Sequence, residues 1–282
     1  MKQIYRLQRY TTKIPFAIKK LLLDSLVAVH PLSKSILRDD KVFLFGFPKA
    51  GTTAITVLLA EIADLSMTAE LKYSMYYPDT YRDLASRHIS FQDFVKKNKI
   101  DFKNEVVKEC MLGFYVDQLS NEFPMSKKIF IVRDPRDNFR SLFNRHQIDG
   151  RSLQQKRGTL SEIWQLVFND DWIREDGTDR ANSILVSLCR SWKRMVGNYL
   201  EDSEHIHLIR YEDFLQDKNA LIEDLCDRLN LPKLADVRSK VDLQYNIKGQ
   251  TDIDTKTFFG YRNYDLITSF CTTELDLLNY DL

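Results

Sequence analysis

Short apolar runs alternate along this chain with longer segments in which apolar residues recur every three or four positions. The short runs predict strands over residues 42–47, 105–110, 129–133 and 205–209. The longer segments predict helices over residues 52–65, 90–98, 135–146, 180–201 and 218–230. Because the strand runs are mostly apolar, they indicate a sheet buried between helices on both faces. The predicted fold class is therefore α/β, a three-layer sandwich with a central, mostly parallel sheet.

The stretch 148–178 breaks this alternation, since it mixes glycines and acidic residues with Trp164 and Trp172. It predicts an insertion, either a lid with one short helix or a structural surface feature. We expect a single domain over residues 39–282, preceded by a helical extension over residues 1–38.

The predicted N-terminal extension is basic: its first twenty residues hold six lysines and arginines and no acid. Four of these basic residues fall on one face of a helix, namely Lys2, Arg6, Arg9 and Lys13. Such a stripe is typical of a helix that lies on an anionic membrane surface, and also of a solvated helix face or a frayed terminus. The longest apolar run, residues 21–29, is short and contains Asp24, so we expect no membrane span.

Composition narrows the classes of function. The formal net charge of +1 gives no general attraction to nucleic acid, so any anion binding must be local. The four cysteines are scattered without a Cys-x-x-Cys pair, which predicts reduced thiols rather than disulfides or a structural zinc. The five histidines are too dispersed to predict a metal centre. We therefore expect a cytoplasmic protein with no metal ion and no nucleic acid partner, whose only membrane contact is peripheral.

The segment Gly46-Phe-Pro-Lys-Ala-Gly-Thr-Thr53 joins the first predicted strand to the first predicted helix. Backbone N–H groups at such a helix start, together with the helix dipole, form a site for phosphate oxygens. Gly46 and Gly51 have the spacing of the phosphate loop of nucleotide-binding enzymes, Gly-x-x-x-x-Gly-Lys-[Ser/Thr]. Here, however, Thr52 occupies the lysine position, and the lysine, Lys49, comes three residues earlier.

A second phosphate motif follows the predicted strand 129–133. Asp134 and Pro135 come directly after Arg133, and proline suits the first turn of a helix. That helix would carry Ser141, eight residues beyond Arg133, back over the end of the strand.

These two motifs, together with Ile209-Arg-Tyr-Glu-Asp213 after the last predicted strand, resemble the sulfotransferases that use 3′-phosphoadenosine 5′-phosphosulfate (PAPS). The resemblance covers roughly residues 40–215 and implies a fold like that of P-loop NTPases. It implies that the 5′-phosphosulfate is held by Lys49, Ala50, Gly51, Thr52 and Thr53. It also implies that Arg133 and Ser141 hold the 3′-phosphate, the guanidinium bidentately and the hydroxyl through a third oxygen. Lys49 would stabilise the bridging oxygen as the 5′-phosphate leaves.

The general base is suggested by comparison with two branches of the family. In the glycan-acting branch a glutamate follows the helix after the phosphate loop, and Glu70 falls near that position. The cytosolic small-molecule branch has a histidine where this chain has Lys108 and Glu109. We therefore expect Glu70 to be the base, with Lys108 as its partner and Glu109 as the rival. Alternation along a strand would place Lys108 and Glu109 on opposite faces.

Two departures concern the nucleotide. Ala54 stands where the small-molecule branch has a tryptophan that stacks on adenine, so adenine needs another platform, such as Tyr211 or the C-terminal aromatic residues. The C-terminal loop that contacts the 3′-phosphate is matched poorly. Two segments are candidates for it, residues 248–249 and residues 256–263, and we favour the second because it contains Lys256 and Arg262.

The sequence thus predicts an enzyme that transfers a sulfuryl group from PAPS to a hydroxyl or amine of a glycan, glycolipid or similar acceptor. The alternative is a P-loop nucleotide kinase or other phosphotransferase, because the architecture is shared. A third possibility is a binding protein that keeps the fold without turnover.

Overall fold

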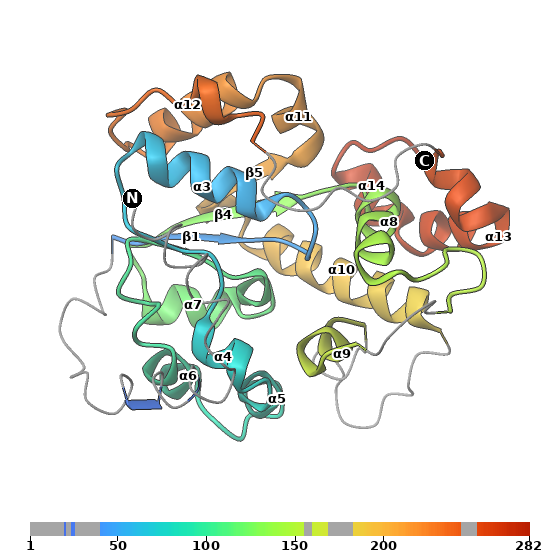
Figure 1. The fold of residues 1–282 in the computed structure, drawn as a ribbon, viewed down its shortest axis with the longest axis horizontal. Coiled ribbons are helices and arrows are strands. Elements are labelled where there is room, and N and C mark those ends of the chain that lie inside the picture. Colours follow the sequence, from blue (N-terminus) through green and yellow to red (C-terminus); the bar gives the residue numbers. More distant parts are fainter. Residues whose placement is uncertain (1–19, 21–23, 26–39, 155–159, 169–182, 244–252) are drawn as a thin grey trace.

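Five parallel strands form the sheet in the part of the chain that the structure describes, in the order β2-β3-β1-β4-β5 (Figure 1). They are β1 (Val42–Phe45), β2 (Met67–Thr68), β3 (Val106–Lys108), β4 (Lys127–Val132) and β5 (Ile206–Arg210). The computed structural model describes residues 20, 24–25, 40–154, 160–168, 183–243 and 253–282. The predicted α/β class and parallel sheet are confirmed. The sequence analysis missed β2, which is only two residues long.

Helices flank both faces of this sheet (Figure 1). Those predicted from the sequence are α3 (Thr52–Ile62), α6 (Phe91–Lys97), α8 (Pro135–His146), α10 (Ile184–Glu201) and α12 (Lys218–Arg228). Helix α9 (Glu162–Phe168) lies within the insertion 148–178, where one short helix was expected. The others are α4 (Lys72–Tyr76), α5 (Asp79–Ala85), α7 (Val116–Glu122), α11 (Tyr211–Gln216), α13 (Thr255–Phe270) and α14 (Thr272–Leu277). Residues 180–182 of the predicted helix 180–201 lie outside the described residues.

Alternate residues of each strand pack into two separate cores. Val42 and Leu44 of β1 pack with residues of α3 and α12 on one face. Phe43 and Phe45 point to the other face, where they join a larger core that includes Trp192 of α10. Burial on both faces explains why the central strand β1 is apolar at every position.

The order of the strands creates a crevice at the carboxyl ends of the strands. From β1 the chain builds β2 and β3 on one side, and it then crosses to build β4 and β5 on the other side. The loops that follow β1 and β4 therefore diverge, which leaves a crevice at the carboxyl ends of the strands, where ligands bind in open α/β sheets. Gly46 directly follows β1 there, so close to β4 that a Cβ atom would lie 2.2 Å from the Ile131 carbonyl oxygen.

Most of the predicted N-terminal extension, and with it the basic stripe, lies outside the described residues. Lys20 and Asp24 are described, and both contact Tyr77, which follows α4. The Tyr77 hydroxyl donates to Asp24 Oδ1 at 2.6 Å, and Lys20 Nζ lies 4.0 Å from the centre of the tyrosine ring. Within the described residues, no helix has the length and apolar character needed to cross a membrane.

Candidate active site

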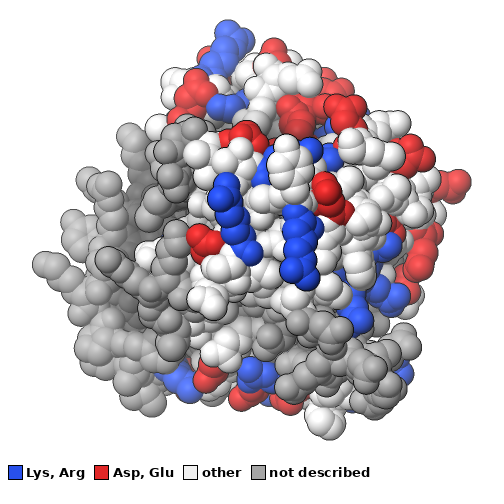
Figure 2. All heavy atoms as spheres, turned by 90° about the vertical axis from the view of Figure 1, so that its right-hand side faces the viewer, with Lys and Arg blue, Asp and Glu red and all other residues white. Residues whose placement is uncertain are grey.

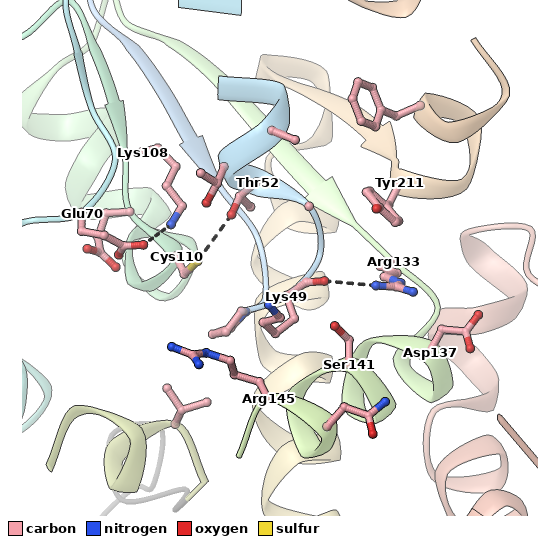
Figure 3. A pocket seen from close by; sticks show the side chains of 18 of the residues that line it. Lys49, Thr52, Glu70, Lys108, Cys110, Arg133, Asp137, Ser141, Arg145 and Tyr211 are labelled. Carbon is pink, nitrogen blue, oxygen red and sulfur yellow. Dashed lines mark hydrogen bonds and ion pairs between the residues drawn. The ribbon is translucent and has the colours of Figure 1, made fainter. Parts of the chain in front are cut away.

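A cavity of about 800 Å³ opens at the carboxyl ends of β1, β3 and β4 and beside the start of α11. Most of the residues singled out from the sequence line it: Lys49, Gly51, Thr52, Thr53, Glu70, Lys108, Arg133, Ser141 and Tyr211. Figure 3 shows their arrangement around Lys49, with Glu70 and Lys108 on one side and Arg133, Ser141 and Tyr211 on the other. Ala50 is fully buried in the core and does not line the cavity.

The loop between β1 and α3 is shaped by two residues with left-handed backbone conformations, Lys49 (φ 75°) and Gly51 (φ 91°). Two reasons favour glycine at position 51. Its positive φ suits a residue without a side chain, and a Cβ atom there would lie 2.2 Å from the Tyr211 ring. No side chain caps the start of α3, and the N–H groups of Ala54 and Ile55 donate to the Gly51 carbonyl oxygen, so those of Thr52 and Thr53 are available to an anion.

Two side chains donate hydrogen bonds to carbonyl oxygens of this loop. Arg133 Nη1 donates to the Lys49 carbonyl oxygen at 3.3 Å, and Asn138 Nδ2 donates to the Pro48 carbonyl oxygen at 2.6 Å. The Arg133 guanidinium also lies 4.8 Å from the centre of the Tyr211 ring. The neighbouring Asp134 binds Arg136 at 2.7 Å instead of Arg133. The second phosphate motif is therefore physically attached to the first.

The electrostatics around Lys49 favour an anionic ligand. Burial, followed by the positive charges of Arg145 and Arg133, lowers the pKa of Lys49 below its ordinary value. Cations held this close together repel one another, so an anion placed among them is stabilised by all of them.

Across the cavity, Lys108 and Glu70 form an ion pair, with Lys108 Nζ 2.6 Å from Glu70 Oε1. The Lys108 side chain is 3% exposed and the Glu70 side chain is 47% exposed, so the carboxylate faces the open cavity. Burial alone would lower the pKa of Lys108, but the neighbouring Cys110, Glu70 and Glu109 raise it above its ordinary value. The lysine therefore stays charged and holds Glu70 in the cavity wall.

Glu109 also lines the cavity, which corrects the expectation that only one of Lys108 and Glu109 would face it. β3 ends at Lys108, and Glu109 caps a short 3₁₀ helix (Cys110–Phe114), so strand alternation no longer applies. Its buried carboxylate accepts from the N–H groups of Met111 at 3.1 Å and Leu71 at 3.2 Å. Burial, and then repulsion from Glu70, raise the pKa of Glu109 to about 7. Because Leu71 directly follows Glu70, this contact fixes the backbone that carries Glu70.

The polar face of α8 also belongs to the cavity, although the sequence analysis identified only Ser141 there. The cavity-lining residues of this helix are Asp137, Arg140, Ser141, Asn144 and Arg145. They follow the spacing of one helix face, so this stripe was a usable signal in the sequence. Cys110 was missed as well: its Sγ lies 3.8 Å from the Thr52 hydroxyl, and burial raises the pKa of the thiol to about 11.

The favoured C-terminal segment does not reach the cavity with the expected residues. Lys256 packs over Tyr261 and Tyr264, at 4.8 and 5.4 Å from the ring centres, and Arg262 lines a separate hollow beside Arg151. Residue Thr255 does contact α8, since Arg140 Nη1 donates to its hydroxyl at 3.1 Å. The other candidate segment, 248–249, lies outside the described residues.

The side of the molecule that carries α13 and α14 shows acidic and basic side chains interspersed rather than a field of one sign (Figure 2). A mixed surface of this kind does not attract anions broadly. The cations that converge on Lys49 therefore stand out as a local feature of the cavity.

Comparison with known proteins identifies the family, since the family described as "Sulfotransferase domain" matches residues 39–249. The chain belongs to the sulfotransferase family. The predicted family and enzyme class are thereby confirmed. A comparison with curated proteins found no match. The preference for the glycan-acting branch stays a prediction.

Solved sulfotransferases share the fold. A sulfotransferase from Alicyclobacillus acidocaldarius is 16% identical, with a TM-score of 0.50 over 86% of this chain and 97% of that one. Sulfotransferase STF9 from Mycobacterium avium is 12% identical, with a TM-score of 0.54 over 98% of this chain and 82% of that one. At these identities the likeness concerns the sulfotransferase fold alone.

Proposed function

We propose that this sulfotransferase uses PAPS as donor and transfers its sulfuryl group to a hydroxyl or amine of a glycan, glycolipid or similar acceptor. The observation that carries the proposal is the direct bond from Arg133 Nη1 to the carbonyl oxygen of Lys49. This bond joins Arg133, a cation suited to binding the 3′-phosphate, to the loop at Lys49, which is suited to binding the 5′-phosphosulfate.

The residues of the cavity fit such a donor. The uncapped start of α3 and the hydroxyl groups of Thr52 and Thr53 offer donors to the 5′-phosphosulfate. Arg133 and Ser141 lie on the far side of Lys49, where a 3′-phosphate would meet a guanidinium and a hydroxyl (Figure 3). Tyr211 lies beside them under the Arg133 guanidinium, and it is the adenine platform that we propose in place of the tryptophan replaced by Ala54.

We also propose direct contacts from Lys256 and Arg262 to the 3′-phosphate, which require the start of α13 to move toward α8. Lys256 directly follows Thr255, whose hydroxyl accepts from the cavity-lining Arg140. Along the chain, Lys256 is therefore closer to this contact than Arg262 is. Cytoplasmic location and peripheral membrane contact through the basic N-terminus belong to the same proposal.

In the reaction the acceptor oxygen forms a bond to sulfur, the bond from sulfur to the bridging oxygen breaks, and the bridging oxygen leaves with its electron pair. Lys49 stabilises the charge that develops on that oxygen. Glu70 takes the proton from the acceptor hydroxyl, and Lys108 orients Glu70 through their 2.6 Å contact. Sulfuryl transfer needs alignment and charge stabilisation, so fixed cations and one positioned proton acceptor suffice.

The test compares two donors. The protein is incubated with PAPS and a broad acceptor library, and release of adenosine 3′,5′-bisphosphate (PAP) is measured. A parallel reaction contains ATP, Mg²⁺ and the same acceptors, with ADP release as the readout. We expect PAP release that depends on acceptor and no ATP turnover. ATP turnover without PAP release would favour the phosphotransferase, and tight PAP binding without sulfation of any acceptor would favour a binding protein.

A further inference from the structure

Helices α4 and α9 lie below the sheet in Figure 1, and both contribute residues to the cavity; we call this part of the cavity its entrance. The side chains that α4 and α9 contribute to it are apolar. Met75 of α4 contributes from one side, and Ile163, Trp164 and Val167 of α9 contribute from the other. Met75 is 41% exposed, which makes it one of the exposed large apolar side chains of the described residues.

Helix α9 presents its apolar residues to the cavity and its polar residues elsewhere. Ile163, Trp164 and Val167 line the cavity, whereas Glu162 and Gln165 are exposed and do not. The ring of Trp164 is fixed by His146, whose ring centre lies 4.2 Å away. The position of Trp164 in the cavity wall is therefore supported by packing against α8.

An acceptor that is polar throughout fits these walls poorly. Each sugar hydroxyl placed against Met75, Ile163 or Val167 would give up its bonds to water without gaining a partner, which is costly. An alkyl or aryl group at the same place would be stabilised by leaving water. The same cavity also presents the polar groups of Glu70 and Lys108, and the reacting hydroxyl belongs beside them.

We propose that the acceptor is an amphiphilic alcohol, with its apolar body between α4 and α9 and its reacting hydroxyl beside Glu70. This inference rests on the proposed sulfotransferase reaction and narrows its acceptor class. A glycolipid or lipid alcohol fits the entrance, and a free glycan chain does not.

Calorimetry on the full chain tests the proposal without requiring the natural acceptor. The protein is first saturated with PAP, and failure of PAP to bind would count against the proposed function. The PAP complex is then titrated with alkyl β-glucosides of increasing chain length, from methyl to decyl. Free gluco-oligosaccharides are titrated in parallel.

We expect affinity to rise roughly three- to fourfold for each methylene that is buried in the entrance. Met75→Ser should weaken binding of the longest glucoside severalfold and leave PAP affinity unchanged. Met125→Ser is the matched control, because Met125 is 73% exposed and does not line the cavity, and it should change neither affinity. An affinity that is independent of chain length, or oligosaccharides that bind more tightly than the alkyl glucosides, would overturn the proposal while leaving PAP binding intact.

Discussion

Replacing Glu70 with glutamine separates proton transfer from the packing of the cavity wall. The amide keeps the shape of the side chain, and its oxygen can still accept from Lys108 Nζ, which lies 2.6 Å from Glu70 Oε1. It cannot take a proton from the acceptor. General-base catalysis contributes about 10²–10⁴-fold, so we expect kcat for sulfuryl transfer to fall by that factor while PAP affinity is unchanged.

The cost of Glu70→Gln in stability should be small by comparison. Removing one partner of a fully buried ion pair costs about 3–5 kcal/mol. Here Glu70 is 47% exposed, so water screens the pair, and the Glu109 carboxyl group remains close to Lys108. We therefore expect a loss of about 1 kcal/mol or less, which is a fall in Tm of about 2–4 °C for a chain of this size. A large loss of activity at 25 °C would then not reflect unfolding.

The assay is the pH–rate profile of sulfuryl transfer from labelled PAPS to the best acceptor of a broad library, for the wild type, Glu70→Gln and Glu109→Gln. The acidic limb should disappear with Glu70→Gln, because the amide does not titrate. Glu109→Gln should act by loosening the backbone at Leu71, so it should retain an acidic limb. If Glu70→Gln is fully active and Glu109→Gln is inactive, the base is Glu109 and our reasoning about Glu70 is wrong.

Three further predictions concern the phosphate loop and the buried carboxyl group. Lys49→Ala should fold normally and lose about two orders of magnitude or more in sulfuryl transfer, and near-normal turnover would remove Lys49 from the mechanism. Gly51→Ala should lower both Tm and PAP affinity, because the added Cβ would lie 2.2 Å from the Tyr211 ring, whereas Gly197→Ala, where a Cβ meets nothing within 4 Å, should spare PAP binding. The pKa of Glu109, raised to about 7 from 4.5, means that the folded protein holds this proton more tightly than the unfolded chain. Its contribution to the free energy of unfolding should therefore fall as pH rises from about 4.5 to about 7, and denaturant titrations should show a flatter pH dependence for Glu109→Gln over that window.

The sequence predicted the features that depend on local chemistry. The loop at Lys49 and Gly51, the strand predicted over residues 129–133, and the helix that begins at Pro135 are each specified by residues next to one another in the chain. All three are found, and the strand (β4) ends one residue earlier than predicted, at Val132. The start of α6 is likewise specified locally, since the Asp93 N–H donates to Ser90 Oγ at 3.0 Å.

The features that were missed depend on contacts between distant residues. β2 and the short helices α4, α5 and α11 are too short to be stabilised by their own sequence, so their packing against the sheet decides them. Glu109 faces the cavity because the strand ends at Lys108, which its apolar run did not reveal. Lys256 and Arg262 were predicted to contact the 3′-phosphate because their segment is rich in basic and aromatic residues. The position of α13, however, is decided by its contacts with α8 and α10.

The most direct test of the account is whether the protein recognises the 3′-phosphate of its nucleotide through Arg133 and Ser141. Calorimetric titration with PAP and with adenosine 5′-monophosphate, which lacks that phosphate, measures this preference for the wild type and for each alanine variant. We predict that the wild type binds PAP far more tightly, that Arg133→Ala removes most of this preference, and that Ser141→Ala removes less, since a charge-assisted contact exceeds a neutral one. If the wild type binds both nucleotides equally, or if both variants keep the full preference for PAP, the proposed donor site is contradicted.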